Sequence, residues 1–304
     1  MNKFVFLFVL ALCGIHVSSL DLERTNRIAG GSPASETGFR YMVSLQERSQ
    51  LGANTRGHKC GGALYTLRHV VTSASCVHVQ TSGQWAVIRP SDYRVFAGSV
   101  DLTNDTSADR HRGIERITVH PDYRTNTPYA NDIAVITLAS EFPSNVVSTV
   151  ALAVNDPGTL QGPVCQASGW GSTDQANTAS TQLMQITKTV YDLDPCRGVY
   201  GTSIPGYPQI NIVNSMICAL NAQTSSCQGD LGNPLVCNST LNGVLIAHRN
   251  ECSDQPNPLP EVYTRISSFR SWLQTTAGAS TFKPGMAILG LICIVQLVSA
   301  KILQ

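Results

Sequence analysis

Short apolar segments separated by turn residues occupy most of the chain between its two ends. Each segment is rich in Val, Ile, Leu, Tyr and Thr, and Gly, Pro, Asn or Asp punctuate the sequence between them. This pattern predicts β-strands. The predicted strands cover residues 41–47, 61–74, 93–100, 132–139, 162–170, 242–248 and 261–266. Many short strands without long amphipathic helices favour an all-β sandwich or barrel.

One segment near the end of this region has helical periodicity instead. The apolar residues of segment 266–276 recur at spacings of three and four, so they share one face of a helix. These residues are Ile266, Phe269, Trp272 and Leu273. We therefore expect a helix that closes the folded domain.

The first nineteen residues have the layout of a secretory signal peptide. An early lysine precedes an apolar run over residues 4–13, and the small residues Ser18 and Ser19 follow. The apolar run is too short to span a membrane. We expect a signal peptide over residues 1–19, a short propeptide over residues 20–27, and an extracellular protein, secreted or anchored at the cell surface.

The other end of the chain is also apolar. Residues 285–300 form an apolar run, which a short spacer separates from the small residues 277–280. This order is typical of a glycolipid-anchor (GPI) signal, whose tail is removed. We favour this interpretation of residues 277–304 and expect membrane attachment through the tail. A short transmembrane anchor and a tail that packs on the domain remain alternatives, since Lys301 interrupts the apolar character.

Ten cysteines are present, and two of them, Cys13 and Cys293, lie in the predicted signal peptide and tail. The remainder is an even number in a secreted domain, which predicts disulfides but leaves their connectivity open. This remainder comprises Cys60, Cys76, Cys165, Cys196, Cys218, Cys227, Cys237 and Cys252. A zinc site is disfavoured because no C-x-x-C pair occurs, and we expect no metal or other cofactor.

The charge of the chain is nearly balanced. Its formal net charge is +1, and 13% of its residues are charged. These values give no basic face for a nucleic acid, so we expect no nucleic-acid partner.

Two polar loops contain candidate surface sites. Asn104 and Asn238 each begin an N-x-S/T pattern, which predicts N-glycosylation at the surface. Asp101, Asp105 and Asp109 lie in the polar segment around Asn104, where calcium binding is an alternative to a solvated charged loop. We favour the solvated loop because the three residues lack a recognisable calcium-ligand spacing.

Six motifs occur in an order that resembles one enzyme family. They are RIAGG at residues 27–31, TSASC at 72–76, NDIAVITL at 131–138, GWG at 169–171, CQGDLGNPL at 227–235 and PEVYTRI at 260–266. Their order and separations are similar to those of the chymotrypsin-like (trypsin-like) serine proteases over about residues 28–275. The resemblance implies two antiparallel β-barrels, with the functional site in the cleft between them, and a protease homology domain over residues 28–276.

The catalytic positions implied by the resemblance are degenerate. The family chemistry needs a nucleophilic hydroxyl, an imidazole base and a carboxylate that orients the imidazole. Ser75 stands at the histidine position, Leu231 stands at the serine position, and only Asp132 is kept. Asn233 also replaces a family glycine in the turn beside Leu231. Since loss of the base or the nucleophile removes on the order of 10⁶ from turnover, we expect a pseudoprotease without catalytic residues.

The resemblance also implies a changed specificity pocket. Ser225 falls at the base of the primary pocket, and Arg249 and Glu261 stand where the family has glycines in the pocket walls. Glycines keep such a pocket open because they have no side chain. We expect Arg249 and Glu261 to fill or close the pocket by pairing with each other. The alternative is that both point to solvent on shifted loops.

Structural parts of the family pattern are retained. Arg27 and Ile28 resemble the activation cleavage site, and Asp230 is the residue that would receive the new amino terminus of Ile28 in a buried ion pair. The disulfides implied by the resemblance join Cys60 with Cys76, Cys165 with Cys237, Cys196 with Cys218, and Cys227 with Cys252.

These features predict a non-catalytic serine protease homologue that acts by protein binding, as a decoy, cofactor or regulator in extracellular proteolysis. The expected partner is an extracellular protein, namely a protease, an inhibitor or a receptor. A serine-type endopeptidase with a rebuilt active site and a folded relic without a selected role remain alternatives.

Overall fold

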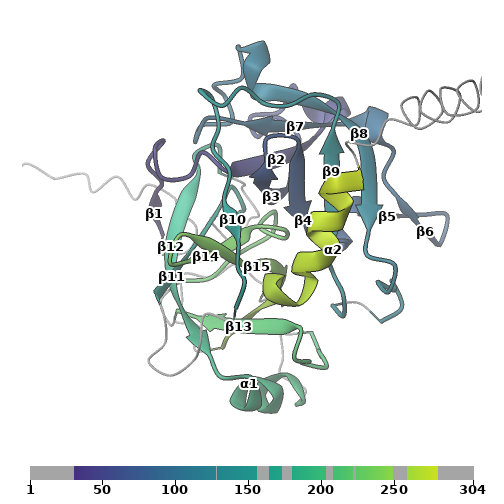
Figure 1. The fold of residues 1–304 in the computed structure, drawn as a ribbon, viewed down its shortest axis with the longest axis vertical. Coiled ribbons are helices and arrows are strands. Elements are labelled where there is room, and N and C mark those ends of the chain that lie inside the picture. Colours follow the sequence, from purple (N-terminus) through teal and green to yellow (C-terminus); the bar gives the residue numbers. More distant parts are fainter. Residues whose placement is uncertain are drawn as a thin grey trace, which may run out of the picture.

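The computed structural model describes residues 31–127, 129–155, 164–172, 180–202, 208–221, 224–248 and 259–279. Within these residues the chain forms two antiparallel β-barrels and two α-helices (Figure 1). The predicted signal peptide, propeptide and most of the tail lie outside the described residues, as do Arg27, Ile28, Arg249 and Cys252.

The first barrel closes in the order β2-β3-β4-β9-β8-β7. Its strands are β2 (Met42–Glu47), β3 (His58–Thr66), β4 (His69–Thr72), β7 (Tyr93–Ala97), β8 (His111–Val119) and β9 (Ala134–Leu138). Apolar side chains from all six strands fill its interior, among them Val43, Leu64 and Ile136. The predicted strand over residues 61–74 is in fact two strands, because the chain turns at Leu67 and Arg68.

The second barrel follows the order β12-β11-β14-β15-β16-β13, and a pairing between β12 and β13 closes it. Its strands are β11 (Val164–Gly169), β12 (Met184–Tyr191), β13 (Met216–Leu220), β14 (Pro234–Cys237), β15 (Thr240–Ala247) and β16 (Glu261–Arg265). Two short strands extend the sheet: β1 (Ser32–Pro33) pairs with β12, and β10 (Ala151–Leu152) pairs with β15. The predicted all-β fold of two antiparallel barrels is therefore confirmed.

Several elements were not predicted. They are β1, β8, β10, β12, β13, β14, the hairpin formed by β5 (His78–Thr81) and β6 (Gln84–Val87), the helix α1 (Leu193–Tyr200), and the 3₁₀ segments Arg48–Gln50, Ser75–Val77, Pro90–Asp92 and Ala108–Arg110. Strand β8 illustrates the reason, because its sequence HRGIERITV has charged residues between the apolar ones and only Ile114 is buried. Because so few of its positions are apolar, the strand lacks the apolar pattern from which a strand is predicted in a single sequence.

The C-terminal helix α2 (Ile266–Ala279) begins at the predicted residue and confirms the predicted helix. Its buried side chains Ile266, Phe269 and Leu273 pack in one cluster with residues of both barrels. The cluster partners are Ala63, Val71, Ile133 and Val135 from the first barrel and Leu241 and Val244 from the second. The helix therefore joins the two barrels. Neither described helix has the length and apolar character that a membrane crossing requires.

Three disulfides implied by the family resemblance are formed. Cys60 bonds to Cys76, Cys165 to Cys237 and Cys196 to Cys218. The first of these ties β3 to the 3₁₀ segment that contains Ser75. The predicted bond of Cys227 stays a prediction, because its partner Cys252 lies outside the described residues.

Candidate functional site

Residues of both barrels line a cleft of about 350 Å³, and the structure brings Ser75, Asp132 and Leu231 together in its wall. Ser75 begins the 3₁₀ segment after β4, Asp132 comes shortly before β9, and Leu231 lies in the turn before β14. Because β4 and β9 pair with each other, Ser75 and Asp132 become neighbours although 57 residues separate them. The hydroxyl of Thr264 donates a hydrogen bond of 2.7 Å to the Asp132 carbonyl and links this segment to the second barrel.

The carboxylate of Asp132 is almost completely buried, with 1% of the residue exposed. The backbone N–H of Ser75 donates to Oδ1 at 2.8 Å, whereas the buried Oδ2 has no hydrogen-bond partner among the described residues. Burial raises the pKa of Asp132 to about 6, although donors from Ser75 and Ala74 oppose this effect. The site therefore retains a carboxylate that is costly to ionise.

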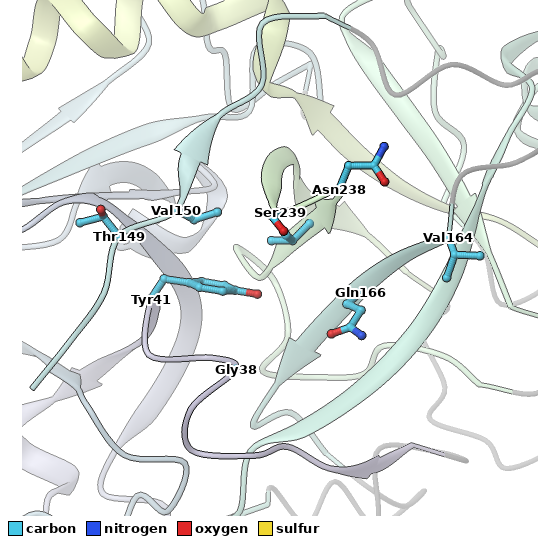
Figure 2. Close-up of a pocket in the computed structure, with 9 residues that line it drawn as sticks. Gly38, Tyr41, Thr149, Val150, Val164, Gln166, Asn238 and Ser239 are labelled. Carbon is cyan, nitrogen blue, oxygen red and sulfur yellow. The ribbon is translucent and has the colours of Figure 1, made fainter.

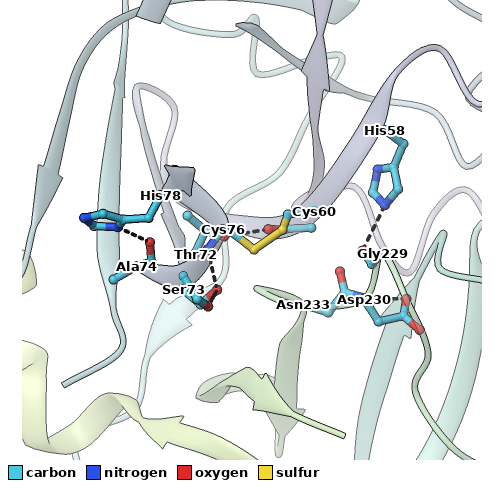
Figure 3. Close-up of a disulfide and its surroundings, with 12 residues drawn as sticks. His58, Cys60, Thr72, Ser73, Ala74, Cys76, His78, Gly229, Asp230 and Asn233 are labelled. Carbon is cyan, nitrogen blue, oxygen red and sulfur yellow. Dashed lines mark hydrogen bonds between the residues drawn. A yellow bond between two sulfur atoms is a disulfide. The ribbon is translucent and has the colours of Figure 1, made fainter. Parts of the chain in front are cut away.

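The histidines closest to Ser75 in the chain do not serve this carboxylate. His78 directs its Nδ1 to the carbonyl of Ala74 at 2.7 Å (Figure 3). His69 contacts the hydroxyl of Thr66 through Nδ1 at 2.7 Å. The Ser75 hydroxyl itself donates to the hydroxyl of Ser73 at 3.0 Å. The hydrogen bonds described for His69 and His78 are therefore made within their own segments and not with Asp132.

Leu231 extends the apolar lining of the second barrel. Its side chain is partly buried and packs against the core cluster that contains Leu235 and Leu245. Its carbonyl accepts a hydrogen bond of 3.0 Å from Gly61, which fixes the turn against β3. A leucine side chain offers no proton or lone pair, so packing is the contribution that it can make at this position.

The carboxylate of Asp230 binds several donors around the same turn. It accepts hydrogen bonds from the N–H groups of Gly171 at 2.9 Å and Cys227 at 2.8 Å, and from the amide of Asn233 at 2.8 Å. Figure 3 shows Asn233 beside Asp230. These donors stabilise the charged carboxylate of Asp230. Its predicted role as acceptor for the amino terminus of Ile28 stays a prediction.

Asn233 fits its position because two glycines leave room for it. A Cβ added to Gly61 would lie 1.6 Å from Oδ1 of Asn233, and a Cβ added to Gly169 would lie 1.9 Å from Nδ2. Real Cβ atoms do not approach other atoms so closely, since cores are packed to near crystal density. Asn233, which departs from the family pattern, therefore fits a space that these two glycines leave, and it is hydrogen-bonded to Asp230.

His58 contributes to the same region, although the sequence did not single it out. Its Nδ1 accepts from the hydroxyl of Ser44 at 2.7 Å, and its Nε2 donates to the carbonyl of Gly229 at 3.1 Å. Burial lowers the pKa of His58 to about 4. The ring is therefore neutral at physiological pH and holds the Gly229 turn through one donor and one acceptor.

The predicted specificity pocket contains an ion pair. Glu261 is 2% exposed, and its carboxylate contacts Nζ of Lys188 at 2.7 Å. The backbone N–H and hydroxyl of Ser226 and the hydroxyl of Tyr263 also donate to this carboxylate. Burial acts to raise the pKa of Glu261, but the charge of Lys188 and these donors outweigh burial, so that the pKa lies below its ordinary value.

The alternative that Glu261 points to solvent is therefore wrong, whereas its expected pairing with Arg249 stays a prediction because Arg249 lies outside the described residues. The side chain points inward, and Lys188 balances its charge. The neighbouring Ser225 is 2% exposed, and its hydroxyl has no hydrogen-bond partner among the described residues. The two charged side chains thus lie buried where the resemblance implies an open pocket.

Lys188 could have been found from the sequence. It lies in β12, whose burial alternates along MQITKTVY, and the inward positions on either side of it are Ile186 and Val190. A strand alternates its side chains between two faces, so a lysine two residues from each of two inward apolar residues must also point inward. A buried lysine requires a carboxylate partner, so the acidic residues of neighbouring strands would have been the candidate partners.

The predicted surface sites lie away from this cleft. Asn104 and Asn238 are exposed, as glycosylation requires. Asn238 also borders a second pocket of about 430 Å³, into which the ring of Tyr41 extends (Figure 2). Asp105 is held by Arg56 and Arg94. Among the described residues, no three metal-ligating side chains gather into a site.

Comparisons with known proteins agree with this architecture. The family model described as "Trypsin" matches residues 28–273. Trypsin beta of Drosophila erecta is 30% identical, over 91% of this chain and 100% of the fly protein. A chymotrypsin-like serine proteinase of Haliotis rufescens is also 30% identical, over 87% of this chain and 96% of that protein.

A solved structure shows the same likeness in three dimensions. Neuropsin, described as a serine protease expressed in the limbic system of mouse brain, superposes with a TM-score of 0.66 and 25% identity. The match covers 82% of this chain and 99% of neuropsin. Together with two closed barrels and an aspartate that lies beside the family's histidine and serine positions, these matches show that the chain belongs to the trypsin family of serine proteases.

Proposed function

We propose that this member of the trypsin family is a non-catalytic protein that acts by binding an extracellular protein. The observation that carries the proposal is the state of the three catalytic positions. Asp132 is retained in the cleft, but Ser75 supplies no imidazole and Leu231 supplies no hydroxyl. A serine hydroxyl is far too weak a base to activate a nucleophile, and leucine has none to activate.

The buried pair of Lys188 and Glu261 supports the same proposal. The two side chains lie at the position that the resemblance assigns to the primary pocket, and each neutralises the charge of the other. A substrate side chain would have to displace this pair or bind elsewhere. The cleft is thereby suited to recognition without cleavage, by a protein such as a protease, an inhibitor or a receptor.

The absence of turnover is tested with the purified chain, a diverse fluorogenic peptide library and a fluorophosphonate probe for active serines. We expect no probe labelling and hydrolysis at least about 10⁶-fold below that of an active trypsin at equal concentration. The active trypsin is the positive control. Turnover that disappears in an Asp132→Ala variant would show a rebuilt active site and refute the proposal.

The protein acts outside the cell and is held at the membrane by a glycolipid that replaces its C-terminal tail. The signal-peptide pattern of residues 1–19, the small residues 277–280 and three formed disulfides support this placement. Affinity capture from native membranes, followed by mass spectrometry, is expected to find mature chains that begin at Leu20 or Ile28 and end within residues 277–280. Chains that retain residues 1–19, or that end at Gln304, would contradict the corresponding part of the proposal.

A further inference from the structure

The second pocket, of about 430 Å³, shares none of its described lining residues with the cleft at Asp132. Tyr41 reaches it from the segment before β2, and β11 and the β14–β15 turn form the wall across from the ring (Figure 2). Its described lining contains hydroxyl, amide and apolar side chains but no charged one. The volume is within the range of small-molecule sites, roughly 300–1,000 Å³, and this lining favours a neutral ligand with both polar and apolar groups.

The ring of Tyr41 provides an aromatic surface inside the second pocket. It enters the pocket with its hydroxyl end towards Gln166 and Ser239 (Figure 2). Burial raises the pKa of Tyr41 far above its ordinary value, so the hydroxyl remains protonated at physiological pH and can donate a hydrogen bond. An aromatic face beside polar groups suits a sugar, because a pyranose ring has an apolar face of C–H groups and a rim of hydroxyl groups.

Val164 forms an apolar part of the same pocket that water reaches. It is 65% exposed and is one of only four large apolar side chains that are exposed among the described residues. A single exposed valine is common on protein surfaces. At the wall of a pocket, however, a ligand that fills the pocket removes this side chain from water.

A rigid turn holds Asn238 at the rim of the second pocket. Asn238 and Ser239 connect β14 to β15, and their φ angles are 49° and 60°. Positive φ at both residues is the requirement of a tight type I′ turn. The preceding Cys237 is bonded to Cys165, and its carbonyl accepts a hydrogen bond of 2.9 Å from the hydroxyl of Thr240. The backbone of Asn238 is therefore fixed beside the pocket.

The side chain of Asn238 can deliver a sugar to this pocket. It is exposed and begins one of the two N-x-S/T patterns. Its amide is directed away from Tyr41 in Figure 2, but an exposed side chain can change its χ1 and χ2 rotamers. A sugar on this amide is confined near the pocket at an effective concentration of the order of millimolar, so that even a weak contact becomes populated.

We infer that Asn238 carries an N-linked glycan whose first N-acetylglucosamine occupies the second pocket against Tyr41 and Val164. Attachment forms a bond from Nδ2 of Asn238 to C1 of the sugar. It breaks the bond from C1 to the pyrophosphate of a lipid-linked oligosaccharide donor, and the displaced amide proton is lost to solvent. The apolar face of the sugar covers the tyrosine ring, and its polar groups meet Gln166 and Ser239. The inference goes beyond the proposed binding function and does not depend on it.

The test follows the acetyl methyl group of this sugar by NMR. The full chain is produced in eukaryotic cells fed with isotope-labelled N-acetylglucosamine, and an endoglycosidase then leaves one such sugar on each glycosylated asparagine. We expect the Asn238 methyl signal to lie upfield of that of free N-acetylglucosaminyl-asparagine, because the methyl group lies over the face of the Tyr41 ring. We also expect nuclear Overhauser contacts between this methyl group and the ring protons.

Three variants control the measurement. Tyr41→Phe keeps the aromatic ring and is expected to keep the upfield signal, whereas Tyr41→Leu is expected to return it to the free position. Thr106→Ala removes the glycosylation pattern of exposed Asn104 and is expected to leave the Asn238 signal unchanged. This last variant also assigns the two methyl signals.

Several outcomes would overturn the inference. They are an Asn238 without sugar in mass spectrometry of the purified protein, a methyl signal at the free position, and an upfield signal that persists in Tyr41→Leu. If Tyr41→Leu does not fold, the Overhauser contacts in the intact protein decide, because their absence refutes the inference without any variant.

Discussion

Lys188→Met is expected to lower the free energy of unfolding by about 3–5 kcal/mol at pH 7, because it leaves Glu261 charged and unpaired inside the second barrel. Lys188 and Glu261 are both nearly inaccessible, and their charged atoms are 2.7 Å apart. The intact pair contributes little net stability, since each charge was removed from water to form it. The large effect therefore comes from the charge that is left behind, and urea unfolding followed by far-UV circular dichroism measures it.

Two variants control this prediction. Lys188→Met combined with Glu261→Gln is expected to recover most of the loss, because no uncompensated charge remains in the core. Lys59→Met removes a lysine that is only partly buried and is expected to change the stability by no more than about 0.5 kcal/mol. If Lys188→Met lowers the free energy of unfolding by less than about 1 kcal/mol, the two residues do not form an ion pair that is shielded from water.

The pH dependence of the same variant follows from the pKa of Glu261. In the intact protein this pKa is lowered below the ordinary value of 4.5, so the pairing stabilises the fold above that pH and is lost as the pH falls. Without Lys188, burial remains and raises the pKa of Glu261, so the folded variant takes up a proton more readily. The destabilisation caused by Lys188→Met should therefore shrink as the pH falls from 7 towards 4.

The second large effect is expected at Asp132 and has the opposite sign. Asp132→Asn should gain stability relative to the intact protein by about 3 kcal/mol as the pH rises from 4 to 7.5. The folded protein holds the pKa of Asp132 at about 6, above its ordinary value of 3.8, because burial disfavours the ionised form. A difference of this size corresponds to about 3 kcal/mol between the folded and unfolded states.

The sign follows from proton binding. Between pH 4 and pH 6 the folded state keeps the Asp132 proton that the unfolded state has lost, so the intact protein loses stability as the pH rises through this window. Asparagine does not titrate and escapes that loss. Urea unfolding of both proteins at half-unit pH steps measures the difference, and Asp109→Asn at an exposed position is the matched control. A difference that is constant with pH would show that Asp132 is not desolvated.

A stability cost at Asp132 is consistent with a role in binding. Functional sites commonly hold groups that a partner satisfies and that destabilise the free protein.

The sequence allowed much of the fold and part of the site to be predicted. Short apolar segments bounded by turn residues marked most of the barrel strands, and helical spacing marked α2 from its first residue. Ser75, Asp132 and Leu231 were placed in one cleft because the flanking motifs resemble those of the trypsin family. Strand β8 was missed because its pattern is locally weak, and its pairing with β7 and β9 in the closed barrel defines it instead.

Tertiary contacts decided the rest of the site. The structure shows that Lys188, 73 residues away in the chain, is a partner of Glu261 that was not predicted, and the expected pairing of Glu261 with Arg249 stays a prediction. Asn233 was identified only as a departure from the family, and the structure shows that Gly61 and Gly169 leave the niche in which it bonds to Asp230.

By itself, therefore, the sequence determined the barrel architecture, the three disulfides between described cysteines through the family resemblance, and the chemical identity of the side chains at the catalytic positions. These properties depend on local periodicity or on residue identity. Only the tertiary structure decided which charge is balanced in the core and which is left unpaired. Lys188 reaches Glu261, whereas Oδ2 of Asp132 meets no hydrogen-bond partner among the described residues. The physical reason is that barrel closure brings together strands that are distant in the chain, and burial then makes the presence or absence of each polar partner energetically decisive.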